Sequence, residues 1–157
     1  MIGRAVVLVS IAWATAAGAA APAPAPAIHI PDGGPGISFD FPNLKIGVAQ
    51  YEDGPTGTTV FYFPNRALVA VDVRGGAPGT VNTDILRLGY SDRFIDAIVF
   101  AGGSLYGEEA TTAVMTALMD DGSHNGDWNN IAMSAGAIIY DFVDHRLNDI
   151  YPDKRLA

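Results

Sequence analysis

The chain has 157 residues, of which 49% are hydrophobic and 17% charged, and this balance predicts a packed domain rather than a disordered segment. The formal net charge is −8 and the nine Lys and Arg residues form no cluster, which argues against a nucleic-acid-binding protein. Because the sequence has no cysteine, disulfides, thiolate nucleophiles and Cys-ligated metal sites are excluded.

Residues 1–21 have the layout of a secretory signal peptide. Arg4 supplies a positive charge, residues 5–16 form an apolar run, and small residues with A-x-A-like cleavage options follow. The alternative is an uncleaved anchor helix, although the run is short for a membrane span. Residues 22–37 are rich in Pro and Gly and predict a linker and an irregular lead-in. We therefore expect a secreted or periplasmic protein, free of the membrane after cleavage, whose domain occupies residues 38–157.

The domain segment mixes strand-like and helix-like patterns. Apolar and β-branched runs predict five strands, over residues 44–51, 58–63, 67–73, 94–100 and 131–142. Short turns, one of them at Pro64-Asn65, join the first three and suggest an antiparallel meander. Apolar residues at three- and four-residue spacing predict an amphipathic helix over residues 108–119. A short helix is expected over residues 83–88, capped by Asn82 or Thr83.

The stretch Ala67–Asp84 contains the sharpest break in this pattern. Its strand-like run stops at Gly75 and Gly76, which permit positive φ angles and close backbone approach. Asp72 and Arg74 precede the break two residues apart, so their side chains start on one face if the strand continues through them. The segment is either a plain turn closed by a surface ion pair or a turn that shapes the wall of a pocket.

The segment Gly102–Gly107 lies between a predicted strand and a predicted helix, where phosphate-binding loops occur. Its spacing matches neither G-x-G-x-x-G nor G-x-x-x-x-G-K-[ST], so a nucleotide site is not expected. We interpret Gly102 and Gly103 as allowing the helix start to pack closely on the sheet, with Ser104 as a candidate cap. Ser104 is a weak candidate for a hydrolase nucleophile, because the G-x-S-x-G elbow lacks its closing glycine.

A Ser-His triad would need one of the three histidines, which lie in loop-like or terminal contexts: His29, His124 and His145. They show no metal-ligand spacing and are expected at the surface. Asp120, Asp121 and Asp127 lack the D-x-D-x-D-G order of a calcium loop. We therefore expect no metal site.

Two residues late in the chain can carry chemistry. Tyr140 lies in the last predicted strand, and Lys154 is one of only two lysines in the sequence. A desolvated lysine or tyrosine can transfer protons or donate to an oxyanion. The residues alone leave open a solvated lysine and a half-buried tyrosine.

Several motifs in order resemble the self-processing, DmpA-like P1/S58 peptidase family. They are SFDFPNLKIGVAQYEDGPTGTTV, VDVRGGAPGT, AGGSLYGEEA, AIIYDF and YPDK, and they cover most of residues 38–157. Within the family, FDFP, YEDGPTGTTV, IYDF and YPDK resemble most the 6-aminohexanoate-oligomer (nylon-oligomer) endohydrolases. The resemblance implies an α/β fold, a four-layer α/β/β/α sandwich of the DmpA/ornithine acetyltransferase type, of which this chain holds the N-terminal half.

The resemblance also implies a mechanism and site residues. In this family a precursor cuts itself ahead of a Ser or Thr, whose freed amine then acts as its own general base. Tyr140 matches the family's active-site tyrosine, and Lys154 matches the active-site lysine of the nylon-hydrolase branch. The signature residues of the pocket are Asp72, Arg74, Gly75, Gly76, Gly102 and Gly103.

The nucleophile, the Asn of the oxyanion site and the acidic residues that support the nucleophile have no counterpart in this sequence. We therefore expect an N-terminal fragment, inactive alone, of an exported amide-bond hydrolase that needs no cofactor. Its expected partners are a small peptide or oligoamide substrate, the missing C-terminal half or β chain, and further copies in a homo-oligomer. The alternative is a secreted, non-catalytic binding module of the same fold.

Overall fold

The computed structural model describes residues 23–31, 34, 36, 38–54, 56–76, 78–90, 93–142 and 149–157. The predicted signal peptide, residues 1–21, lies outside the described residues, as does His145. Within the described ranges, no helix has the length and apolar character needed to cross a bilayer.

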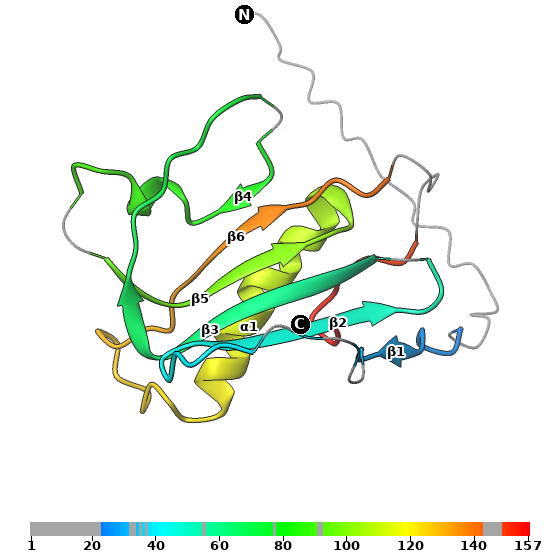
Figure 1. Ribbon diagram of the computed structural model, residues 1–157, viewed down its shortest axis with the longest axis horizontal. Helices are drawn as coiled ribbons and strands as arrows, with labels where there is room; N and C mark the ends of the chain where they lie inside the picture. The colour runs from blue at the N-terminus through cyan, green and yellow to red at the C-terminus, as the bar shows by residue number, and fades with distance from the viewer. Residues whose placement is uncertain are drawn as a thin grey trace, which may run out of the picture.

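A six-stranded mixed sheet forms the body of the domain, with its strands in the order β1-β2-β3-β5-β6-β4 (Figure 1). The strands are β1 (Ile28–His29), β2 (Lys45–Tyr51), β3 (Thr56–Leu68), β4 (Thr80–Val81), β5 (Phe94–Ala101) and β6 (Ser134–Ile138). All neighbours are antiparallel except β5 and β6, which are parallel. A parallel pair needs a crossover connection, and the helix α1 (Glu109–Asp120) provides it. The predicted α/β class is confirmed.

Helix α1 buries its apolar stripe on one face of the sheet. Ala110, Val114 and Leu118 recur at helical spacing and pack on β5. The predicted helix is therefore confirmed to within one residue at each end. A 3-10 turn, η2 (Ser104–Glu108), precedes it, and Gly103 holds the N-cap position of that turn. The expected cap role of Ser104 is wrong, because Ser104 is already the first residue of η2 and no side-chain cap forms there.

The predicted turn at Pro64-Asn65 is wrong. Strand β3 runs through this dipeptide, and the register with β5 shifts between Tyr62 and Ala67. A bulge is one of the few places where a sheet tolerates proline, which cannot donate a ladder hydrogen bond. Asn43 stabilises the bulge, since its amide donates to Arg66 O at 2.9 Å and its carbonyl accepts from Asn65 N–H at 2.7 Å. The antiparallel meander therefore consists of β2, β3 and β5.

Other predicted elements are shorter than expected. The short helix is a 3-10 turn, η1 (Asp84–Leu86), and Thr83 precedes it without a side-chain cap. The predicted strand 67–73 ends at Leu68, and the predicted strand 131–142 is paired only over Ser134–Ile138. Strand β4, which pairs with β6, lies in a polar stretch for which we predicted no strand.

The sheet face opposite α1 is largely open in the part of the chain that the structure describes. Leu86 of η1 packs with Ile95 and Ala135 at one end of this region. Elsewhere apolar side chains stay exposed: Ile46 and Val48 of β2 are each 45% exposed, and Ile139 is 59% exposed. Figure 1 shows the single helix on the other side of the strands.

Candidate active site

A pocket of about 380 Å³ lies beside the ends of β5 and β6. It is lined by Pro78, Gly79, Ser104, Leu105, Ile138 and Tyr140. The two strands are parallel, so their carboxyl ends meet at the same edge, which is where α/β sheets place ligand sites. Tyr140 is 63% exposed, and its phenol is therefore accessible from solvent.

Backbone hydrogen bonds hold two walls of this pocket together. Ile138 N–H donates to Gly79 O at 2.8 Å, and Ile139 N–H donates to Ala101 O at 2.8 Å. A Cβ atom on Gly79 would stand 3.1 Å from the Ile138 side chain, so glycine permits this close approach. Tyr140 thus follows a segment that is anchored on both sides.

The Gly102-Gly103 dipeptide directly precedes the lining residues Ser104 and Leu105, and its predicted close packing is confirmed. A Cβ atom on Gly102 would overlap the Asp141 carboxylate. One on Gly103, whose φ is +79°, would stand 2.8 Å from both Tyr151 Cβ and Pro152 Cδ. Ser104 follows with a φ of +53°, a strained conformation for a non-glycine residue of the kind that clusters at functional sites.

The segment that carries Lys154 is fixed by its neighbours. Lys154 N–H donates to Glu109 Oε1 at 3.0 Å, and Tyr151 Oη–H donates to Glu109 Oε2 at 3.1 Å. This carboxylate raises the pKa of the Tyr151 phenol above its ordinary value. Asp153 accepts a 2.6 Å hydrogen bond from Tyr51, and burial together with this bond raises the pKa of Tyr51 to about 12.

Tyr140 and Lys154 have different surroundings. Asp141, next to Tyr140, packs against Gly102 of the glycine dipeptide, and Tyr151 and Pro152 pack against Gly103. Lys154 is exposed and is not one of the described residues that line the Tyr140 pocket. The structure therefore brings Tyr140 to the glycine loop and puts Lys154 beside the start of α1.

The Asp72–Gly76 segment is an exposed turn. Arg74 Nη2 lies 2.6 Å from Asp72 Oδ2, although β3 ends before either residue. Gly75 has a φ of +94°, which explains a glycine at this position. The surface ion pair is present. None of residues 72–76 lines the pocket, although Pro78 and Gly79, a little further along the chain, do. A pocket role for Asp72, Arg74, Gly75 and Gly76 stays a prediction.

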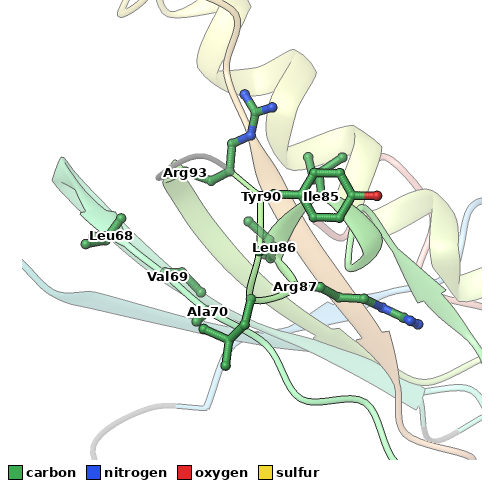
Figure 2. A pocket seen from close by; sticks show the side chains of 10 residues that line it. Leu68, Val69, Ala70, Ile85, Leu86, Arg87, Tyr90 and Arg93 are labelled. Carbon is green, nitrogen blue, oxygen red and sulfur yellow. The ribbon is translucent and has the colours of Figure 1, made fainter.

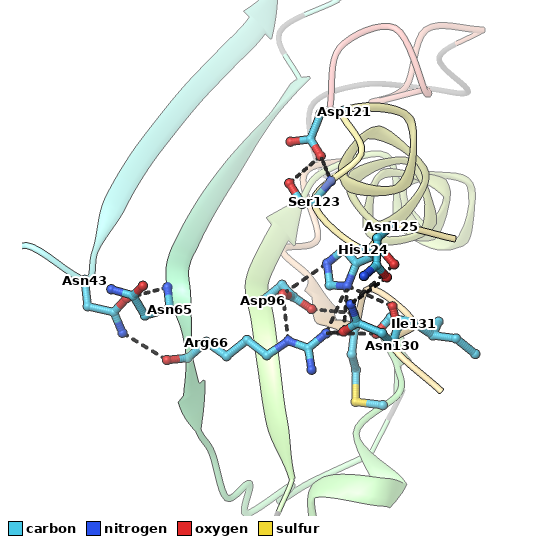
Figure 3. A network of polar contacts seen from close by, with 11 residues as sticks. Asn43, Asn65, Arg66, Asp96, Asp121, Ser123, His124, Asn125, Asn130 and Ile131 are labelled. Carbon is cyan, nitrogen blue, oxygen red and sulfur yellow. Dashed lines mark hydrogen bonds and ion pairs between the residues drawn. The ribbon is translucent and has the colours of Figure 1, made fainter. Parts of the chain in front are cut away.

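The prediction that the histidines lie at the surface holds for His29 but is wrong for His124. The His124 side chain is only 9% exposed, and its Nε2 lies 3.3 Å from Asp96 Oδ1 (Figure 3). Its Nδ1 lies 2.9 Å from both Arg66 Nη2 and Asn130 O. Its partners come from β3, β5 and the loop after α1, so no local pattern could have indicated its burial.

This polar network is structural rather than catalytic. Asp96 Oδ2 accepts a 2.7 Å hydrogen bond from Met133 N–H, and Asp96 Oδ1 lies 3.1 Å from Arg66 Nε. His124 follows the C-terminal end of α1, whereas Ser104 precedes the N-terminal end. A twelve-residue helix is about 18 Å long, so His124 cannot activate Ser104.

A second hollow, of about 320 Å³, lies near η1 at the opposite end of β5 (Figure 2). It is lined largely by apolar residues, among them Leu68, Ile85 and Leu86, with Arg87 and Arg93 at its border. Arg87 is paired with Asp84 at 3.0 Å. This hollow is at the amino ends of the parallel strands, and it contains none of the predicted site residues.

Among the described residues, no three His, Asp or Glu side chains are grouped as metal ligands. The sequence predicts site roles for Tyr140 and for Gly102 and Gly103, and it includes Pro78 and Gly79 in a stretch that could shape a pocket wall. It does not indicate Leu105 as a lining residue or Asp141 as a contact of Gly102. Residues in extended segments and small residues have no sequence pattern that predicts a position in a pocket wall. Only the pairing of β4 with β6 places Pro78 and Gly79 beside Tyr140.

Comparison with known proteins gives the following matches. The profile of Peptidase family S58 matches residues 38–155. A 6-aminohexanoate-oligomer endohydrolase of Paenarthrobacter ureafaciens is 44% identical over 121 residues, which are 77% of this chain and 32% of that protein. A putative NylC-analogous protein of Agromyces sp. (strain KY5R) is 43% identical over 77% of this chain and 37% of its own length.

An uncharacterized aminopeptidase of Mycobacterium bovis is 43% identical over 86 residues, covering 54% of this chain and 25% of that protein. The chain thus spans about a third of the length of the first two relatives.

Proposed function

Because the chain belongs to peptidase family S58, we propose that it forms the N-terminal part of an exported amide-bond hydrolase. The relatives that resemble it are named as an oligomer endohydrolase and as aminopeptidases. The proposed substrate is accordingly a small peptide or an oligoamide. The proposed nucleophile is a Ser or Thr that self-cleavage frees at a new N-terminus, in a part of the protein beyond these residues.

The observation that carries the proposal is the Tyr140 pocket. An accessible phenol, a strained loop and a hollow of about 380 Å³ lie together at the carboxyl ends of two parallel strands. In the proposed reaction Tyr140 donates a hydrogen bond to the oxyanion or orients the nucleophile. Lys154, beside the start of α1, tunes the charge of the nucleophile from the neighbouring side.

The open sheet face supports the proposal that a further layer completes the domain. Ile46, Val48 and Ile139 are too exposed for the face of a finished core, and a second sheet packed about 10 Å away would bury them. A four-layer α/β/β/α sandwich is the arrangement that we propose. We expect residues 28–157 alone to be inactive and poorly stable, and we expect the complete protein to form a homo-oligomer after export and signal cleavage.

The test compares the complete gene product with residues 28–157, each assayed on a p-nitroanilide and on an aminohexanoate oligomer. We expect turnover only by the complete protein and two chains in its mass spectrum. Activity of the shorter chain would refute the assignment of the nucleophile to another part. Substrate binding without turnover, in a product that stays one chain, would favour a binding module instead.

Tyr140→Phe in the complete protein tests the role of the phenol. We expect kcat to fall about 10²-fold, as on removal of an oxyanion donor. Tyr90→Phe is the matched control, because Tyr90 is 60% exposed against 63% for Tyr140 but lines the hollow near η1. An unchanged kcat in Tyr140→Phe would remove Tyr140 from the mechanism.

A further inference from the structure

We propose that Asp141 is the positioning residue of the Tyr140 pocket. Its carboxylate connects the loop that contains Ser104 and Leu105 to the segment that contains Tyr140. It thereby fixes the distance between these two walls of the pocket. The inference rests on the proposed function, because it concerns the same site. Neither the sequence patterns nor the family comparison assigns a role to Asp141.

Two hydrogen bonds define the position of this carboxylate. Asp141 Oδ1 accepts from Gly103 N–H at 2.9 Å, and Asp141 Oδ2 accepts from Thr56 Oγ1–H at 2.7 Å. The carboxylate fills the space that a Cβ atom on Gly102 would need, so residue 102 must be glycine for the contact to form. One side chain therefore joins the start of β3, the loop after β5 and the segment after β6.

The loop needs such a tie because its backbone is strained. Gly103 adopts its φ of +79° without strain, but Ser104 has a φ of +53°, and a non-glycine residue persists in this conformation only when its surroundings hold it. A hydrogen bond from Gly103 N–H to a carboxylate is charge-assisted and stronger than one to a neutral acceptor. It stabilises the conformation that presents Ser104 and Leu105 to the pocket.

The same contact fixes Tyr140 from its C-terminal side. Ile139 N–H is bonded to Ala101 O on the other side, so Tyr140 stands between one residue held through its backbone and one held through its side chain. Along an extended chain successive side chains point to opposite faces. Accordingly Tyr140 lines the pocket, whereas Ile139 and Asp141 line a separate hollow of about 240 Å³. Asp141 therefore acts through the loop and not on a substrate in the Tyr140 pocket.

The experiment uses three variants of the complete protein. Asp141→Ala removes both hydrogen bonds, and we expect kcat to fall about 10²-fold with a smaller change in KM, as for catalytic groups displaced by about 1 Å. Asp141→Asn keeps an oxygen for Gly103 N–H and gains an amide donor that Thr56 Oγ1 can accept. We expect it to recover kcat to within about tenfold of wild type. Thr56→Val removes only the hydrogen bond to Asp141 Oδ2, and its kcat should fall between those of the two Asp141 variants.

Two further readouts separate positioning from general destabilisation. Effects of Asp141→Ala and Tyr140→Phe should be strongly non-additive, because both disturb one unit. Amide hydrogen exchange of peptides containing Gly103 should be faster in Asp141→Ala and near wild type in Asp141→Asn. A kcat of Asp141→Ala within twofold of wild type, additive effects, or no rescue by Asp141→Asn would each overturn the inference.

The outcome for the proposed function is separate. If the complete wild-type protein hydrolyses neither amide substrate, the proposed function fails. The exchange measurement still decides whether Asp141 holds the loop, since it does not depend on turnover. Unchanged exchange at Gly103 in Asp141→Ala would then refute the positioning role.

Discussion

Two of the Asp–Arg ion pairs among the described residues differ sharply in burial, which allows a direct comparison of buried and exposed charge. Asp96 lies 3.1 Å from Arg66, and the Asp96 side chain is 7% exposed. Asp72 lies 2.6 Å from Arg74, and the Asp72 side chain is 68% exposed. Distance alone would make the Asp72 pair the stronger one, whereas solvation predicts the opposite.

We predict that Asp96→Ala lowers the free energy of unfolding by about 3–5 kcal/mol. The substitution leaves Arg66, His124 and Met133 N–H without the carboxylate to which each is bonded or paired. The His124 side chain is only 9% exposed and that of Arg66 33% exposed, so neither recovers full hydration once the carboxylate is gone. Asp72→Ala should cost about 0–1 kcal/mol, because water solvates the freed guanidinium.

Urea unfolding of the complete protein measures the difference. With a slope of about 2 kcal/mol/M, Asp96→Ala should move the midpoint by about 1.5–2.5 M, and Asp72→Ala by less than about 0.5 M. Raising the salt concentration should reduce the effect of Asp72→Ala, because salt screens the exposed pair, and should leave the effect of Asp96→Ala unchanged. Equal midpoints for the two variants would refute the reasoning that burial, and not the distance between the charged atoms, determines how much each pair stabilises the fold.

The remaining predictions concern the site and its support. Tyr51 has an ordinary pKa of 10.0 and a folded pKa of about 12, so it stabilises the fold below pH 10 and this contribution is lost as the pH rises through 12. Melting temperatures from pH 8 to 12 should fall less steeply in Tyr51→Phe than in wild type, and parallel curves would contradict this. Gly102→Ala forces its methyl group into Asp141 and should destabilise the protein by about 1–3 kcal/mol. Gly47→Ala, where a Cβ atom meets nothing within 4 Å and φ is not positive, should cost less in the same urea titration. Residues 28–157 alone should bind an apolar dye strongly through the open sheet face, and weak binding would show that this face is covered.

Local patterns determined the parts of the fold that depend on near neighbours. The apolar spacing of residues 108–119 predicted α1, and alternating or continuous apolar runs predicted β2 and β5. The pair Gly102 and Gly103 indicated close packing, because glycine has no Cβ atom and therefore lets another segment approach its backbone closely. The order of several motifs also identified the peptidase family without reference to three-dimensional contacts.

Tertiary structure decided what local patterns could not. Pro64 was read as a turn because proline breaks a strand locally, but pairing with β5 on either side keeps it inside β3 as a bulge. His124 was expected at the surface, yet Arg66 and Asp96, far away in the sequence, bury it. Asp141 gained its role from Thr56, 85 residues earlier.

The same division holds for the candidate site. Sequence by itself pointed to Tyr140 and to the glycine loop, since their chemistry and backbone freedom are properties of the residues. Whether they meet in one pocket depends on the parallel pairing of β5 with β6 and on the pairing of β4 with β6. Such pairings join strands that are far apart in the sequence, so a local sequence pattern cannot predict them. Only the folded sheet brings these residues together.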